Sequence, residues 1–132
     1  MLRIRLPYPD HALNPNTRRV WQASLKPKRE AREVGYYSAM EAVRLCYLTP
    51  ERYWSNMSLW WLKPDEPLRL RIAIHPPDNR RRDLDNTVSA IKNYQDGIFS
   101  YIGMDDSKIT YKEVIMRRSC PEGKIVYILY QK

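Results

Sequence analysis

Two short stretches of the chain alternate apolar and polar side chains with the period of a half-buried β-strand. The first covers residues 2–6 (LRIRL), and prolines at positions 7 and 9 end it. The second covers residues 68–75 (LRLRIAIH), carries arginines on one face and ends at Pro76-Pro77. Two further strands are expected over about residues 108–118 and 124–131, on either side of a turn at 121–123.

Two longer stretches repeat apolar residues at helical spacing. The first helix is predicted over about residues 29–48, because Pro15 and Pro27 should interrupt any earlier helix and Thr49-Pro50 should stop this one. The second is predicted over residues 86–99, and Gly103 follows its end. The stripe of the second helix that should face the core consists of Val88, Ile91, Gln95 and Ile98.

These elements follow the order β-α-β-α-β-β, with no internal repeat. We therefore expect an α+β fold, a small single domain over residues 1–132 with two helices and a mixed sheet. An aromatic cluster between Tyr53 and Leu62 has no assigned element. It either covers the core or a dimer interface, or it places Trp54 or Trp60 against an unpaired base.

Composition indicates a globular protein with a polyanionic partner. Of the 132 residues, 43% are apolar and 29% are charged, and 23 Lys and Arg against 15 Asp and Glu give a net charge of +8. This balance favours nucleic acid as the partner. The chain lacks both an apolar run of roughly 18 residues and an apolar signal core, so a cytoplasmic protein without membrane contact is expected.

Acidic residues gather between the second strand and the end of the second helix. Asp83 and Asp85 lie two positions apart, so an extended backbone would point both carboxylates to one side. Two charges about 4 Å apart repel by roughly 4 kcal/mol at an effective dielectric of 20, and a divalent cation relieves this repulsion. Mg²⁺ on such a pair, with water and phosphate oxygens in its other positions, suits phosphodiester hydrolysis.

The second helix extends this candidate site. Lys92 and Asp96 lie seven and eleven positions after Asp85, which places all three on one helix face at 100° per residue. Lys92 could then stabilise charge that develops on a phosphate. A simpler interpretation treats Asp85 or Asn86 as a helix cap and the acids at 105–106 as an ordinary turn.

Several motifs together resemble the RusA family of Holliday junction resolvases. They are the string PDNRRRDLDN at 77–86, a following helix with Lys and Asp four residues apart, the ending GMDD at 103–106, and an opening LPYP at 6–9 followed by Asn14 and Asn16. The resemblance covers nearly the whole chain. It implies a homodimeric, bacterial or phage-encoded endonuclease that uses Mg²⁺, with Mn²⁺ as a substitute, to nick two opposed strands of a four-way DNA junction.

Residue by residue, the resemblance implies metal ligands at Asp83, Asp85 and Asp106. The family's lysine lies four residues after the second acid, where this chain has Ser89. An insertion of three residues, nearly one helical turn, would move this lysine to Lys92 on the same helix face. Lys92 is therefore the expected catalytic lysine.

The expected DNA contacts are basic side chains, since phosphate contacts supply much of the affinity of DNA-binding proteins, together with residues that the resemblance implies, namely Arg82 near the scissile phosphate and the loop with Asn14 and Asn16. They are Arg80, Arg81, Arg82, Arg69, Arg71, Asn14, Asn16, Arg18 and Arg19. The run at 80–82 could equally be a solvated charge cluster. No small-molecule cofactor is expected. Two other functions stay open, a non-catalytic DNA-binding protein and a metal-dependent nuclease of flaps or other branched DNA.

Overall fold

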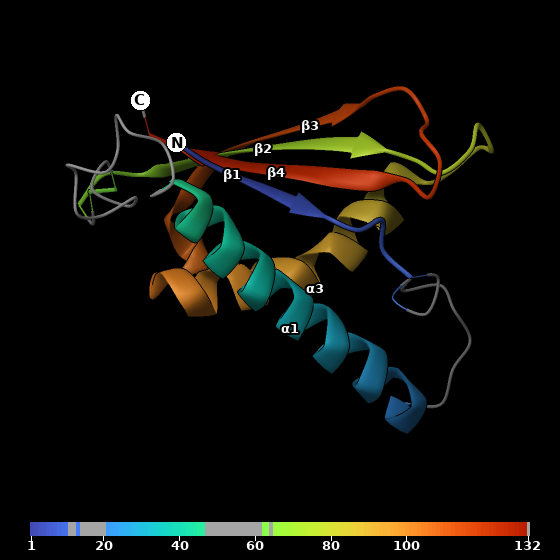
Figure 1. The fold of residues 1–132 in the computed structure, drawn as a ribbon, viewed down its shortest axis with the longest axis horizontal. Helices are drawn as coiled ribbons and strands as arrows, with labels where there is room; N and C mark the ends of the chain where they lie inside the picture. The colour runs from blue at the N-terminus through green and yellow to red at the C-terminus, as the bar shows by residue number, and fades with distance from the viewer. Residues whose placement is uncertain (11–12, 14–20, 47–61, 64, 132) are drawn as a thin grey trace.

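Four strands form one mixed sheet in the described part of the chain, and two long helices lie against one of its faces (Figure 1). The computed structural model describes residues 1–10, 13, 21–46, 62–63 and 65–131. The strands are β1 (Leu2–Leu6), β2 (Leu68–His75), β3 (Ile109–Met116) and β4 (Lys124–Tyr130). Their spatial order is β1-β4-β2-β3, with β2 and β3 parallel and the other neighbours antiparallel.

The two helices are α1 (Trp21–Cys46) and α3 (Leu84–Ile102), and a short 3-10 helix, η2 (Asp106–Lys108), precedes β3. Because β2 and β3 are parallel, the chain must cross the sheet between them, and α3 makes this crossover. The predicted element order and the α+β class with a mixed sheet are therefore confirmed.

The alternation in β2 decides which of its side chains face the helices. Its leucines and isoleucines are fully buried, whereas the alternate positions, Ala73 included, lie on the opposite face of the sheet. The buried set is Leu68, Leu70, Ile72 and Ile74. Arg69 and Arg71 are on the open face, as the alternation predicts.

The helices α1 and α3 approach each other so closely that glycine is required on both. A Cβ atom at Gly35 would overlap the carbonyl oxygen of Tyr94, and a Cβ atom at Gly97 would overlap the carbonyl oxygen of Arg32. Both helices therefore bring backbone against backbone at this crossing, and any larger residue there would force them apart.

The start of α1 differs from the sequence-based expectation. The helix begins about eight positions earlier than predicted and contains Pro27 within it. A proline removes one helical hydrogen bond and crowds the preceding turn, but it does not forbid a helix. Later positions such as Ala39 and Val43 are buried in the core, and this packing offsets the local cost at Pro27.

Some predictions concern residues outside the described ranges. They are the DNA contacts at Asn14, Asn16, Arg18 and Arg19, and the aromatic residues between 53 and 61. Within the described residues, neither helix combines the length and apolar character that crossing a membrane requires.

Candidate functional site

The centre of the candidate site is an ion pair between α3 and the turn that follows it. Lys92 Nζ lies 2.9 Å from Asp106 Oδ2 and 3.4 Å from Asp96 Oδ1. Lys92 and Asp96 meet because residues four apart share a helix face. Asp106 reaches Lys92 because Gly103, with a φ of 77°, ends the helix in the left-handed conformation and lets the chain turn back.

Both partners of this ion pair are stabilised in their charged forms. The pKa of Lys92 is raised chiefly by its hydrogen bond to Asp106, against the opposing effect of burial. The pKa of Asp106 is lowered by hydrogen bonds donated by Lys92 and then by Gln95. A positive and a negative group therefore stand side by side at neutral pH, beside a third charge on Asp96.

Sequence reasoning missed two buried groups behind Asp106. Tyr127 Oη donates to Gln95 Oε1 at 2.7 Å, and Gln95 Nε2 donates to Asp106 Oδ2 at 3.2 Å. Gln95 is 8% exposed and Tyr127 is 0% exposed. A glutamine inside an otherwise apolar stripe was the available signal, since a buried amide requires partners.

A second cation also lies near this site. Lys112 pairs with Leu70 in the sheet register and so lies on the helix-covered face. Its pKa is lowered first by burial and then by the positive charge of Lys92. No pattern in the amino-acid sequence distinguishes this lysine.

Asp83 and Asp85 lie at the N-terminal end of α3. Asp83 Oδ1 accepts a hydrogen bond from the Asp85 backbone N–H at 2.9 Å, so Asp83 is the N-cap that was expected at Asp85 or Asn86. The seven residues from Asp85 to Lys92 correspond to about 10 Å along the helix axis.

The structure therefore brings Asp106 into contact with Lys92. Among the described residues, no three Asp, Glu, His or Cys side chains form a group that could hold a metal ion. The ligand set Asp83, Asp85 and Asp106 stays a prediction.

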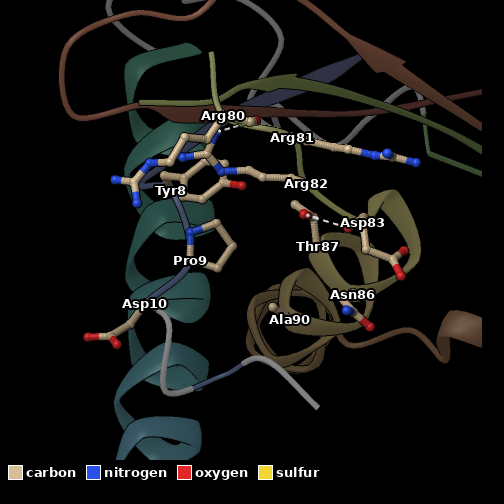
Figure 2. A pocket seen from close by; sticks show the side chains of 10 residues that line it. All are labelled: Tyr8, Pro9, Asp10, Arg80, Arg81, Arg82, Asp83, Asn86, Thr87 and Ala90. Atoms are coloured by element: carbon tan, nitrogen blue, oxygen red, sulfur yellow. Dashed lines mark hydrogen bonds between the residues drawn. The ribbon is translucent and has the colours of Figure 1, made fainter. Parts of the chain in front are cut away.

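The arginine run lines a pocket of about 500 Å³ between the segment after β1 and the start of α3 (Figure 2). Arg82 is turned inward: its guanidinium lies 2.8 Å from Asp78 Oδ1 and covers the ring of Tyr8. Arg80 contacts the other Asp78 oxygen at 3.1 Å but stays 84% exposed. Arg81 extends away from these groups in Figure 2.

Asp78 organises this loop. Its pKa is lowered to about 2, first by the hydrogen bond from the Arg80 backbone N–H and also by those from the Arg82 and Arg80 side chains. Arg82 also donates to the carbonyl oxygens of Asp78 and Arg80. The carboxylate thus holds Arg82 in place, whereas Arg80 and Arg81 present their charges to solvent.

Arg69 and Arg71 lie on the face of the sheet away from α3, and so they are not brought beside Lys92. Arg69 covers the ring of Tyr111 at 5.5 Å, and Arg71 forms an ion pair with Glu113 at 2.7 Å. They are available for a contact with DNA only on that open face.

Comparison with known proteins shows the family but no activity. No protein-family model matches the chain. A protein from Xylella fastidiosa, described as uncharacterized, is 30% identical over 126 residues, which cover 96% of this chain and 74% of the relative. Identity at this level along almost the whole chain shows common ancestry, and the chain therefore belongs to the same family as this Xylella fastidiosa protein.

Proposed function

We propose that the protein is a RusA-like resolvase, a Mg²⁺-dependent endonuclease that cuts four-way DNA junctions by paired nicks. One observation carries the proposal: the 2.9 Å contact of Lys92 with Asp106. The resemblance assigns both residues to one catalytic site although they are 14 positions apart in the sequence, and the structure brings them into contact.

The carboxylates have the chemistry that Mg²⁺ requires. Asp83, Asp85 and Asp106 offer hard oxygen donors, and the Asp85 side chain has no hydrogen bond or ion pair to any described residue. Asp83, Asp85 and Asp106 would hold the ion, which when bound would polarise the phosphodiester and activate a water molecule. The Lys92 ammonium would stabilise the negative charge that grows on the phosphate in the transition state.

Arg80 and Arg81 would hold the DNA backbone near the start of α3. Both side chains are exposed next to Asp83, and each neutralised phosphate contributes about −0.9 to the slope of log affinity against log salt concentration. Arg82 is already paired with Asp78, so in this proposal it keeps the loop in position and would contact DNA only after Arg80 and Arg81 have bound it.

A second copy of the chain would complete the enzyme. A four-way junction has two-fold symmetry and two strands to be cut, which matches a homodimer with one site per subunit. Sedimentation or light scattering of the free protein and of its junction complex measures this stoichiometry. A junction complex that contains one subunit would contradict the homodimer.

The main experiment compares cleavage of a labelled four-way junction and of a linear duplex, with and without Mg²⁺. We expect paired nicks at the junction only with metal. Cleavage of flaps to the same extent would instead indicate a broader nuclease of branched DNA.

Two matched variants separate catalysis from folding. Asp83 caps α3 and Asp105 caps η2 in the same way, and asparagine is as good an N-cap as aspartate. Asp83→Asn should abolish cleavage without loss of junction binding or thermal stability, because it keeps the cap and removes a metal ligand. Asp105→Asn makes the same chemical change at an acid outside the ligand set and should cleave normally.

The capping geometry also favours a second candidate, a DNA-binding protein without catalysis. The carboxylates of Asp83 and Asp105 accept backbone hydrogen bonds at 2.9 Å, which gives each a structural role that needs no metal. In that case junction binding would be independent of Mg²⁺, no cleavage would occur, and both asparagine variants would behave as the wild type.

A further inference from the structure

A chain of hydrogen bonds runs from the sheet to the carboxylate of Asp106. It begins at the hydroxyl of Tyr127, a fully buried residue of β4. Strand β4 lies between β1 and β2 in the sheet. The hydroxyl donates to Gln95 Oε1 at 2.7 Å, and Gln95 Nε2 donates to Asp106 Oδ2 at 3.2 Å. Two elements of the core thus hold a carboxylate at the surface.

The direction of these bonds leaves one orientation for the Gln95 amide. With Oε1 toward the tyrosine hydroxyl, the NH₂ group faces Asp106 and donates to it. The opposite orientation would point Oε1 at the negatively charged carboxylate, and two acceptors would then face each other. Without the hydroxyl, Oε1 would be buried with no donor, and the amide would be free to turn away from Asp106.

Gln95 and Lys92 hold the same oxygen of Asp106 in different ways. The Lys92 side chain is 61% exposed and also interacts with Asp96, so it can exchange its partners for a phosphate. Gln95 is buried and bound to Tyr127, so it cannot move out to contact a phosphate as Lys92 can. The direction of the Asp106 carboxylate therefore depends on Gln95 when the ammonium of Lys92 contacts DNA.

We propose that Gln95 and Tyr127 are positioning residues that aim the Asp106 carboxylate and thereby set the metal affinity of the site. This inference rests on the proposed function, in which Asp106 is a metal ligand. Groups that orient a metal ligand through hydrogen bonds typically change metal affinity or activity by about 10–100-fold when they are removed.

The test uses Tyr127→Phe and Gln95→Met, which remove the hydrogen bonds and keep most of the buried volume. Tyr94→Phe is the matched control, because it removes the hydroxyl of another buried tyrosine, on α3, whose nearby carboxylate is that of Asp10 and not that of Asp106. Binding of Mn²⁺, followed by loss of the free-ion paramagnetic resonance signal, reports on the site without any cleavage. The Mg²⁺ concentration for half-maximal junction cleavage is the second measurement.

We expect both variants to weaken Mn²⁺ binding by about 10–100-fold and to shift the Mg²⁺ requirement by a similar factor. Cleavage at saturating Mg²⁺ should stay within a few fold of the wild type, since no reacting group is lost. Tyr94→Phe should leave both measurements unchanged. Circular dichroism of each variant verifies the fold, and either variant alone suffices for the test.

The outcomes separate this inference from the proposed function. If the wild type binds Mn²⁺ and cuts junctions while Tyr127→Phe and Gln95→Met do so at the same metal concentrations, the positioning role is refuted and the resolvase is not. If the wild type binds no Mn²⁺ and cuts nothing, the proposed function is refuted and the positioning role with it. A loss that is equal in Tyr94→Phe would indicate a general effect of the core and also refute the positioning role.

Discussion

Replacement of Lys92 by alanine should separate a catalytic lysine from an ordinary surface ion pair. The change removes the ammonium that contacts Asp106 at 2.9 Å and Asp96 at 3.4 Å. It leaves α3 intact, because alanine is the best helix former.

The structure sets a low limit on the stability that Lys92 can contribute. Its side chain is 61% exposed, and those of Asp96 and Asp106 are 40% and 32% exposed. Exposed pairs of this kind contribute about 0.2–1 kcal/mol each. By contrast, loss of a donor that stabilises transition-state charge costs about 2.7–4 kcal/mol, or roughly 10²–10³ in rate.

The assay is single-turnover cleavage of a four-way junction at saturating Mg²⁺, with binding and thermal unfolding measured alongside. Lys92→Ala should slow cleavage by roughly 10²–10³ and weaken binding much less. Lys63→Ala is the matched control, because Lys63 forms an exposed pair with Glu66 at 3.3 Å and is 68% exposed. The control should change neither rate nor binding.

Three results would refute the reasoning about Lys92. Cleavage within a few fold of the wild type would remove Lys92 from catalysis. Cleavage and binding that fall together, with a smaller salt slope, would make it a contact to the DNA backbone. Ser89→Ala should be nearly silent. A large effect of this change would show that Lys92 does not replace the lysine that the RusA resemblance expects at position 89.

Three further predictions concern stability and ionisation. Gly97→Ala should destabilise the fold by about 1–3 kcal/mol or more in urea unfolding, because the added Cβ overlaps the Arg32 carbonyl, and unchanged stability would contradict the close helix crossing. The pKa of Asp78, measured by carboxyl NMR, should be about 2. Because folding lowers this pKa, the interactions of Asp78 stabilise the fold fully above pH 3.8, and this stabilisation is lost as the pH falls through about 2. A pKa near 3.8 would contradict the structure of the loop. Lys92→Ala should raise the pKa of Asp106 toward its ordinary value, because the main cause of its lowering is removed, and an unmoved titration curve would contradict the ion pair.

Local patterns in the sequence determined the elements and their faces. The alternation in residues 68–75 correctly predicted both the strand and its buried side, because side chains in a strand point to opposite faces whatever surrounds it. Gly103 correctly marked the end of α3, since a left-handed residue there is a local requirement. Helical spacing also correctly predicted that Lys92 and Asp96 lie on one helix face, where they form an ion pair.

Other features depended on tertiary packing that local patterns do not contain. Pro27 predicted a break, but the burial of later residues of α1 keeps the helix continuous. Gly35 and Gly97 have no distinguishing local signal, because their role exists only where the two helices cross.

The candidate site divides in the same way. The residue types and their spacing in the sequence indicated Asp83, Asp85 and Lys92. The resemblance to the RusA family indicated the acids at 105–106. Only the fold decided that Asp106 meets Lys92 on α3, that Asp83 caps the helix, and that Tyr127, on a distant strand, reaches Gln95. Contacts between residues far apart in sequence depend on how the sheet and helices pack, and the local periodicity of a chain carries no information about that packing.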